Sequence, residues 1–207
     1  MAERPGTQSV EFPGRRLREN TPMDTWPEAP TIACADLTLE PLRVEHAQEM
    51  APALDDVALH TFIGGEPATL DQLRQIYTLQ VGGASPDGTE LWFNWVMRRS
   101  DTREAAGYVQ ATITQENGVS VAEIAWVVAR AHQSRGLARQ AATAMTDWLR
   151  SAGVGRVVAH IHPEHVASNA IATAVGLHPT STLVNGEVRW TSGDQSPRPR
   201  HTTISTN

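Results

Sequence analysis

The sequence contains no lysine and only one cysteine among its 207 residues. All 17 basic side chains are arginines, so the phosphate loop Gly-x-x-x-x-Gly-Lys-Ser/Thr is excluded. No Gly-x-Gly-x-x-Gly follows an expected strand, and a dinucleotide site is therefore unsupported as well. The lone Cys34 cannot form an internal disulfide, which agrees with a reducing, cytoplasmic location.

Long apolar runs and excess positive charge are also missing. No apolar stretch approaches the roughly 20 residues of a membrane-spanning helix. The formal net charge of −6 argues against nucleic acid or an anionic membrane surface as the main partner, because both attract clustered positive charge. We therefore expect neither partner, and we expect a monomer or homodimer. The hydrophobic fraction of 40% is typical of a globular domain.

Composition divides the chain into three parts. Residues 1–31 mix proline, glycine, arginine and glutamate without periodicity, which predicts a flexible N-terminal extension. Residues 193–207 are polar and rich in proline, serine and threonine, which predicts a flexible tail. The 32–192 segment between them has the length of one domain.

Hydrophobic periodicity predicts a mixed α/β domain of the α+β type, with elements in the order β-α-α-β-β-β-α-β-α-β-β. Helices are expected over 44–60, from Thr69 onward through a capping box with Gln72, over 137–149 and over 166–175. Strands are expected over 35–42, 91–99, 107–114, 121–128 and 157–162, followed by a hairpin over 182–190. The Asn-Gly pair inside that hairpin is typical of a type I′ turn.

The turn between the strand over 121–128 and the helix over 137–149 reads Gln133-Ser134-Arg135-Gly136-Leu137-Ala138. The first N–H groups of a helix have no partner within it, so such a turn can hold an anion. Gly136 lets the backbone approach a bulky diphosphate, and Arg135 and Arg139 add positive charge. The turn therefore predicts a site for a phosphate-bearing ligand. An ordinary strand-to-helix connection is the alternative.

Three motifs in the same order resemble those of the GNAT superfamily of N-acetyltransferases. Gln-x-x-Gly-x-Ala resembles its acetyl-CoA pyrophosphate loop, and residues 122–128 resemble the strand that precedes it. Residues 162–169, followed by Gly176-Leu177, are similar to its last-helix motif. The resemblance covers roughly residues 37–190 and is nearest to the ribosomal-protein N-terminal acetyltransferases. It implies the acyl-CoA N-acyltransferase fold, a central, mostly antiparallel mixed sheet flanked by helices.

The resemblance also implies a reaction and its co-substrate. The expected activity is transfer of an acetyl group from acetyl-CoA to a primary amine, by direct attack in a ternary complex and without a metal. The acceptor would be a small-molecule amine or a peptide N-terminus. The residues that the resemblance assigns to acetyl-CoA are Trp126, Val127, Val128, Gln133, Ser134, Arg135, Gly136, Leu137, Ala138, Arg139 and His165.

Two residues are candidates for proton transfer. Glu123 shares a strand face with Ala125 and Val127, and some family members use a glutamate at this position as the general base. A structural carboxylate is the alternative. The family often protonates the thiolate with a tyrosine in the last helix, which this chain lacks, so Ser168 is the substitute candidate. A helix cap is the alternative for Ser168.

The acceptor side is less clearly marked. Glu66 follows the first expected helix, where this fold usually builds its acceptor pocket, and its carboxylate could bind an ammonium group. Trp92 and Trp95, with Trp126, could form an aromatic slot for a cation or a planar group. Burial in the core is the alternative for the tryptophans, and a solvated loop is the alternative for Glu66.

Two other functions are compatible with parts of the sequence. His160, His162 and His165 resemble the first metal motif of zinc-dependent hydrolases, although the further ligands of that fold are not evident downstream. Strand alternation alone would also place His160 and His162 on one face. A non-catalytic acyl-CoA-binding module would retain the Gln133–Ala138 loop and lack turnover.

Overall fold

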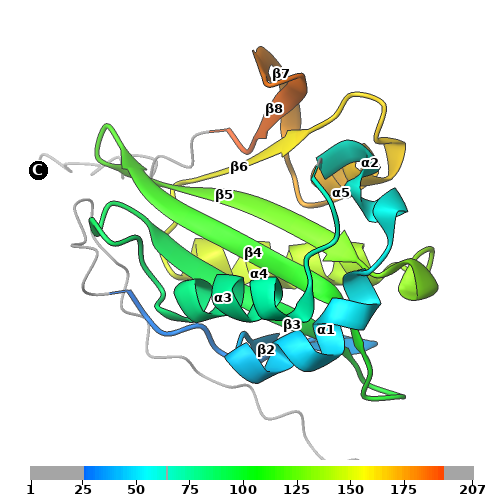
Figure 1. The fold of residues 1–207 in the computed structure, drawn as a ribbon. Helices are drawn as coiled ribbons and strands as arrows, with labels where there is room; N and C mark the ends of the chain where they lie inside the picture. The colour runs from blue at the N-terminus through cyan, green and yellow to red at the C-terminus, as the bar shows by residue number, and fades with distance from the viewer. Residues whose placement is uncertain (1–25, 64, 194–207) are drawn as a thin grey trace, which may run out of the picture.

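The computed structural model describes residues 26–63 and 65–193. Its eight strands form one sheet in the order β1-β2-β3-β4-β5-β6-β8-β7, and all neighbours are antiparallel except β5 and β6 (Figure 1). The mixed, mostly antiparallel sheet is therefore confirmed. The strands are β1 (Ile32–Ala33), β2 (Leu37–Pro41), β3 (Leu91–Arg99), β4 (Ala105–Glu116), β5 (Val119–Val128), β6 (Arg156–Ile161), β7 (His178–Val184) and β8 (Glu187–Thr191).

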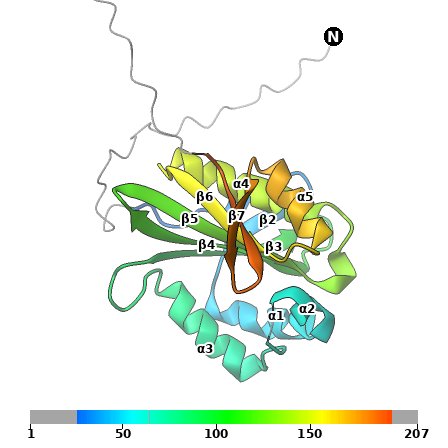
Figure 2. The ribbon, with the colours of Figure 1, turned by 90° about the horizontal axis from the view of Figure 1, so that it is seen from above.

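Helices cover both faces of this sheet. In Figure 2, α4 (Leu137–Ser151) and α5 (Val166–Ala174) lie on one side of the strands. On the other side lie α1 (Ala47–Leu54), α2 (His60–Ile63) and α3 (Leu70–Val81). Strand alternation fits this arrangement, because Trp95 and Met97 belong to the core under α4 while Val96 packs with α1 and α3.

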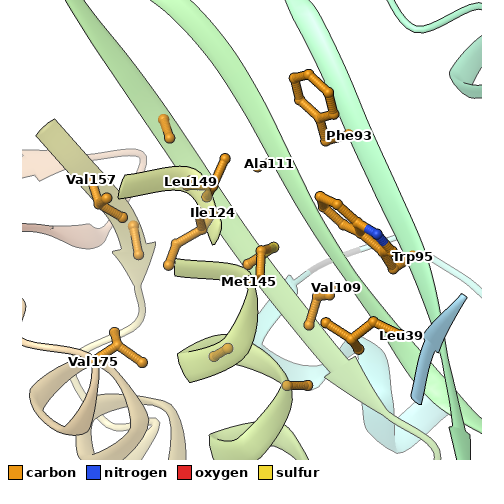
Figure 3. Close-up of a cluster of buried hydrophobic side chains, with 14 of the residues drawn as sticks. Leu39, Phe93, Trp95, Val109, Ala111, Ile124, Met145, Leu149, Val157 and Val175 are labelled. Carbon is orange, nitrogen blue, oxygen red and sulfur yellow. The ribbon is translucent and has the colours of Figure 1, made fainter. Parts of the chain in front are cut away.

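The larger core lies between the sheet and α4 (Figure 3). The apolar face of α4 predicted from its periodicity contributes Met145 and Leu149, both fully buried. The ring of Trp148 contacts that of Trp95 edge-on, with centroids 5.3 Å apart. Aromatic pairs in this geometry add to the stabilisation that burial gives, so they fix α4 on the sheet. The start of α4 is thereby held at a defined place beside β5.

Local turn chemistry confirms two of the expected boundaries. The Thr69 hydroxyl accepts a hydrogen bond from the Gln72 N–H, and the Gln72 side chain accepts one from the Thr69 N–H, which completes the capping box of α3. Asn185 and Gly186 both have positive φ angles, 51° and 86°, as a type I′ turn between β7 and β8 requires.

The single helix expected over 44–60 is wrong. A 3-10 turn over Val44–His46 precedes α1, which ends at Leu54, and a second 3-10 turn over Val57–Leu59 leads into α2. Asp55 leaves the helical region with ψ at 65°, and the Asp56 carboxylate accepts a hydrogen bond from the Ala58 N–H. Aspartate side chains compete with helical hydrogen bonds in this way, and they favour caps over helix interiors.

The last six residues of the expected extension, 26–31, pack on the domain. The Trp26 ring lies with its centroid 6.0 Å from that of Phe93, and the Pro30 carbonyl accepts a hydrogen bond from the Trp95 indole. Residues 1–25 and 194–207, to which the other expectations of flexibility apply, lie outside the described residues. None of the described helices is both long and apolar enough to cross a membrane.

Candidate active site

The two parallel strands β5 and β6 separate part of the way along the sheet (Figure 1). They pair only where Val121–Glu123 of β5 faces residues 156–158 of β6. Beyond that point, no described strand pairs with residues 124–128 on the side of β6. The backbone groups of β5 that point into this fork are therefore available to a ligand that carries amide groups of its own.

A cavity of about 510 Å³ occupies the fork. Its wall combines the end of β5, the start of α4, the end of β6 and the first turn of α5. Of the residues assigned to acetyl-CoA by the resemblance, Arg135 is exposed and does not line this cavity. The structure brings the other ten together there: Trp126, Val127, Val128, Gln133, Ser134, Gly136, Leu137, Ala138, Arg139 and His165.

The turn before α4 is shaped to expose N–H groups. Gly136 caps the helix with φ at 73°, a conformation that favours glycine, and Ser134 also has a positive φ of 61°. The first bond of the helix runs from the Gln140 N–H to the Gly136 carbonyl over 3.1 Å. Within the described residues, the N–H groups of 137–139 have no backbone partner. Together with the exposed Arg139 they form an anion-binding helix start.

Gln133 connects this turn to the strand. Its side-chain amide donates a hydrogen bond to the Val128 carbonyl over 3.0 Å. Gln133 therefore fixes the loop against the end of β5. In doing so it occupies the Val128 carbonyl, one of the backbone groups in the region assigned to acetyl-CoA. The Leu137 side chain anchors the other end of the turn, because it is buried in the core under α4.

Glu123 and His160 face each other where the strands separate. The Glu123 carboxylate lies 3.0 Å from Nδ1 of His160, and the imidazole lines the cavity. The Glu123 side chain is 57% exposed and does not itself line the cavity, so it reaches the cavity wall through its contact with the His160 imidazole. Sequence reasoning treated His160 only as a metal ligand. Strand alternation placed His160 on a strand face, but the parallel pairing of β5 with β6, which brings it to Glu123, is not visible in any motif.

Ser168 and Trp126 meet across the cavity. The Trp126 indole N–H donates to the Ser168 hydroxyl oxygen over 3.3 Å, and both residues line the cavity. The side chain that caps α5 belongs to His165, whose Nδ1 accepts the Ser168 N–H. The interpretation of Ser168 as the helix cap is therefore wrong, and its hydroxyl is free of that role.

His165 is held in its neutral form. Burial lowers the pKa of the His165 imidazole, and the neighbouring His162 lowers it further, although a backbone hydrogen bond opposes both. A neutral ring is also what its role as acceptor at Nδ1 requires. Phe62 of α2, which sequence reasoning did not single out as a ligand contact, lies against this ring and lines the same cavity. The two ring centroids are 4.4 Å apart and the ring planes are tilted by 32°.

Of the three residues assigned to the acceptor, Glu66 and Trp95 line the same cavity and Trp92 does not. Trp95 is fully buried, with its indole packed against Trp148. Trp92 lines neither of the two cavities described in this section and donates to the Glu90 carboxylate over 2.9 Å. Glu66 is exposed and lines a second cavity of about 240 Å³ between the sheet and helices α1 and α3. Its other polar lining residues, which sequence reasoning missed, include Tyr77 and Tyr108.

The structure does not support the zinc interpretation. Among residues 26–63 and 65–193, no three His, Cys, Asp or Glu side chains are close enough together to hold a metal ion. His160 contacts Glu123, and His165 caps α5 through a ring nitrogen. The histidine spacing that suggests a metal motif therefore reflects a strand end followed by a helix cap.

A sheet that forks beside the exposed N–H groups of a glycine-capped helix is the arrangement of a protein that binds an acyl-CoA. Residues 36–178 match the family described as acetyltransferase (GNAT) domain. Because this match spans more than half of the chain, the chain belongs to the GNAT family. It is therefore an acetyl-CoA-dependent N-acetyltransferase. A comparison with curated protein sequences finds no match.

Solved structures agree on the fold. A GNAT-family acetyltransferase from Bacillus anthracis superposes with a TM-score of 0.62 at 15% identity, over 78% of this chain and 96% of that one. The ribosomal L7/L12 α-N-protein acetyltransferase RimL, solved with coenzyme A, gives 0.61 at 18%, over 78% and 97%. A chimera of the Vibrio cholerae spermidine N-acetyltransferase SpeG gives 0.60 at 18%, over 76% and 95%.

Proposed function

We propose that this enzyme acetylates a primary amine by direct attack of the amine nitrogen on the thioester of acetyl-CoA, with both substrates bound together. One observation carries the proposal. The fork cavity and the second cavity share Leu59 and Val127 in their walls, so two ligands can meet beside β5. The acceptor belongs to the class of small-molecule amines or peptide N-termini.

The fork cavity fits acetyl-CoA, which supplies the activated acetyl group. The free N–H groups at the start of α4, with Arg139, suit its diphosphate. The edge of β5 over 124–128, which no described strand pairs on the side of β6, suits its pantetheine amides, apart from the Val128 carbonyl that Gln133 engages. N–H groups of the same edge stabilise the negative charge that develops on the thioester oxygen during attack.

An acyl-enzyme on cysteine is not part of the proposal. Cys34 is the only cysteine of the chain and lines neither the fork cavity nor the second cavity. Burial raises the pKa of its thiol, which disfavours the nucleophilic thiolate. A ternary complex needs no acyl-enzyme and is the route that we propose. A single cysteine also suits a reducing compartment, and we propose a cytoplasmic location.

The proton of the amine passes to Glu123, which His160 orients. Glu123 lies on the same strand face as Val127, four residues away, which is about 13 Å along a strand. Ordered water therefore relays the proton between the amine and the carboxylate. Attack forms the carbon–nitrogen bond and leaves the nitrogen positively charged. As the carbon–sulfur bond breaks, the Ser168 hydroxyl gives its proton to the departing thiolate and takes one back, through water, from that nitrogen. The Trp126 indole already donates to that oxygen, so the hydroxyl proton can point at the sulfur.

Thiol release from acetyl-CoA over a panel of amines tests the proposal. We expect Glu123→Gln to lower kcat roughly 100-fold or more, as general-base loss typically does, with the acetyl-CoA Kd unchanged. Raising the pH should restore part of the rate, because the amine then loses its proton to solvent. Glu116→Gln is the matched control. Glu123 contacts His160 in the wall of the fork cavity, whereas the ion-pair partners of Glu116, Arg156 at 3.1 Å and Arg189 at 3.9 Å, line neither cavity.

Three outcomes would overturn parts of the proposal. Acetyl-CoA binding without turnover on any amine would identify a binding module instead of an enzyme. A fully active Glu123→Gln variant would remove the base assignment while leaving the reaction intact. Parallel rather than intersecting initial-rate lines would exclude the ternary complex.

A further inference from the structure

The second cavity has the size of a small acceptor. Its lining residues come from the sheet and from helices including α1 and α3, and its volume is about 240 Å³. These two helices lie on the face of the sheet opposite α4 (Figure 2). A water molecule occupies about 30 Å³ in the liquid, so the cavity holds at least roughly eight non-hydrogen atoms. Its wall is largely apolar and includes Leu42, Leu54, Ala68, Leu73 and Ile76. A molecule seated there would reach the fork past Leu59 and Val127.

One residue that lines this cavity carries a buried polar atom without a partner. Tyr77 of α3 is 5% exposed, and its hydroxyl makes no hydrogen bond within the described part of the chain. A buried hydroxyl without a partner is costly, so such groups in native structures require an explanation. Burial raises the pKa of the Tyr77 phenol, with Tyr108 nearby in the same direction. The hydroxyl is therefore protonated at neutral pH and can donate to a bound molecule.

The charges around the cavity disfavour a second cation in the acceptor. Among its described lining residues there is no arginine, and Glu66 is the only carboxylate. The Glu66 carboxylate is exposed to solvent at the mouth of the cavity, so water screens its attraction for a cation bound deeper inside. A polyamine would place an ammonium group among apolar side chains without a carboxylate partner, which is strongly unfavourable. The remaining polar groups of the wall include the uncharged amides of Asn94 and Gln110.

Resting on the acetyl transfer proposed above, we propose that the second cavity holds the body of the acceptor and that Tyr77 determines its specificity. The acceptor is a primary amine on an uncharged, largely apolar group about the size of an aromatic ring. A polar atom at the far end of that group hydrogen-bonds the Tyr77 hydroxyl, while the amine points past Val127 into the fork. Arylalkylamines that carry a ring hydroxyl have this chemistry.

Tyramine and 2-phenylethylamine, which differ by one hydroxyl, form the direct test. We expect kcat/KM to favour tyramine about tenfold, the factor of one hydrogen bond between neutral groups. Tyr77→Phe should abolish that preference and leave 2-phenylethylamine unchanged within about twofold. Because it removes a hydroxyl without a partner, the variant should melt at the same temperature as the parent or higher. A lower Tm would show a structural role for the hydroxyl and overturn the assignment.

A second variant and two further amines separate this inference from the proposed reaction. Ala68→Phe narrows the cavity and should raise KM for tyramine at least tenfold, with the acetyl-CoA Kd unchanged. Spermidine and a tripeptide with N-terminal serine should be poor acceptors. If either is acetylated while both arylalkylamines are not, the cavity assignment fails and acetyl transfer stands. If no amine of any class is acetylated, the proposed function itself fails.

Discussion

Gly107 of β4 controls the shape of β5 at the site. The strands approach so closely there that a Cβ atom on residue 107 would lie 2.1 Å from the Val127 carbonyl oxygen and 2.9 Å from Val128 Cα. Residue 107 also has a φ angle of 149°, which residues other than glycine rarely adopt. We predict that Gly107→Ala damages both stability and catalysis, because the obstacle is backbone and cannot rotate away.

The size of both effects follows from this geometry. A carbon–oxygen contact normally lies at about 3.3 Å, so residues 127 and 128 must move by roughly 1 Å. Overpacking and backbone strain together cost about 2–4 kcal/mol, which corresponds to a Tm lower by roughly 5–10 °C for a domain of this size. A displacement of about 1 Å at a reacting centre can lower kcat about 100-fold. Thermal melts and steady-state kinetics measure the two effects.

Gly88→Ala is the matched control for this prediction. Gly88 also has a positive φ, 70°, but a Cβ atom there meets no described atom within 4 Å, and the residue lies in the turn before β3. It should cost about 1–2 kcal/mol through strain alone and leave kcat and KM unchanged. Equal kinetics for Gly107→Ala and the parent enzyme would refute the argument that β5 positions the thioester.

Two further predictions concern the loop before α4 and a buried histidine. Gly136→Glu should weaken acetyl-CoA binding at least about tenfold, because its carboxylate repels the diphosphate at the helix start; calorimetry that finds an unchanged Kd would refute that placement. Burial lowers the pKa of the His46 imidazole, and Arg43 and Arg98 lower it further, whereas Glu49 and Glu40 act in the opposite direction. As the pH falls, the imidazole is therefore protonated in the unfolded chain before it is protonated in the folded one. The free energy of unfolding should then decrease below about pH 6.5, by at most about 1.4 kcal/mol per pH unit. Urea unfolding at pH 7.5 and 5.5 should show a shallower loss for His46→Gln than for the parent protein, and an identical loss would contradict this.

Local signals predicted the features that local interactions decide. The capping box of Thr69 and Gln72, the Asn185-Gly186 turn and the apolar face of α4 all formed as expected, because each depends on residues within a few positions of one another. The end of helix α1 at Leu54 was not predicted, because the apolar periodicity continues past this point. Asp55 and Asp56 interrupt the helix there. Packing of residues 26–31 was also missed, because a composition rich in proline and charge does not show the contact between Trp26 and Phe93.

The sequence by itself determined the family, the mixed sheet and the anion-binding turn from Gln133 to Ala138, since these depend on short motifs and on the order of elements. Only the tertiary structure decided which side chains face one another. It paired Glu123 with His160 and placed His165, in place of Ser168, at the α5 cap. It also packed the Trp95 indole in the core, although Trp95 is part of the wall of the second cavity. It also brought Tyr77 into a cavity that meets the fork at Val127. These contacts join residues far apart in the chain, and their geometry follows from strand register and helix packing, which no local pattern records.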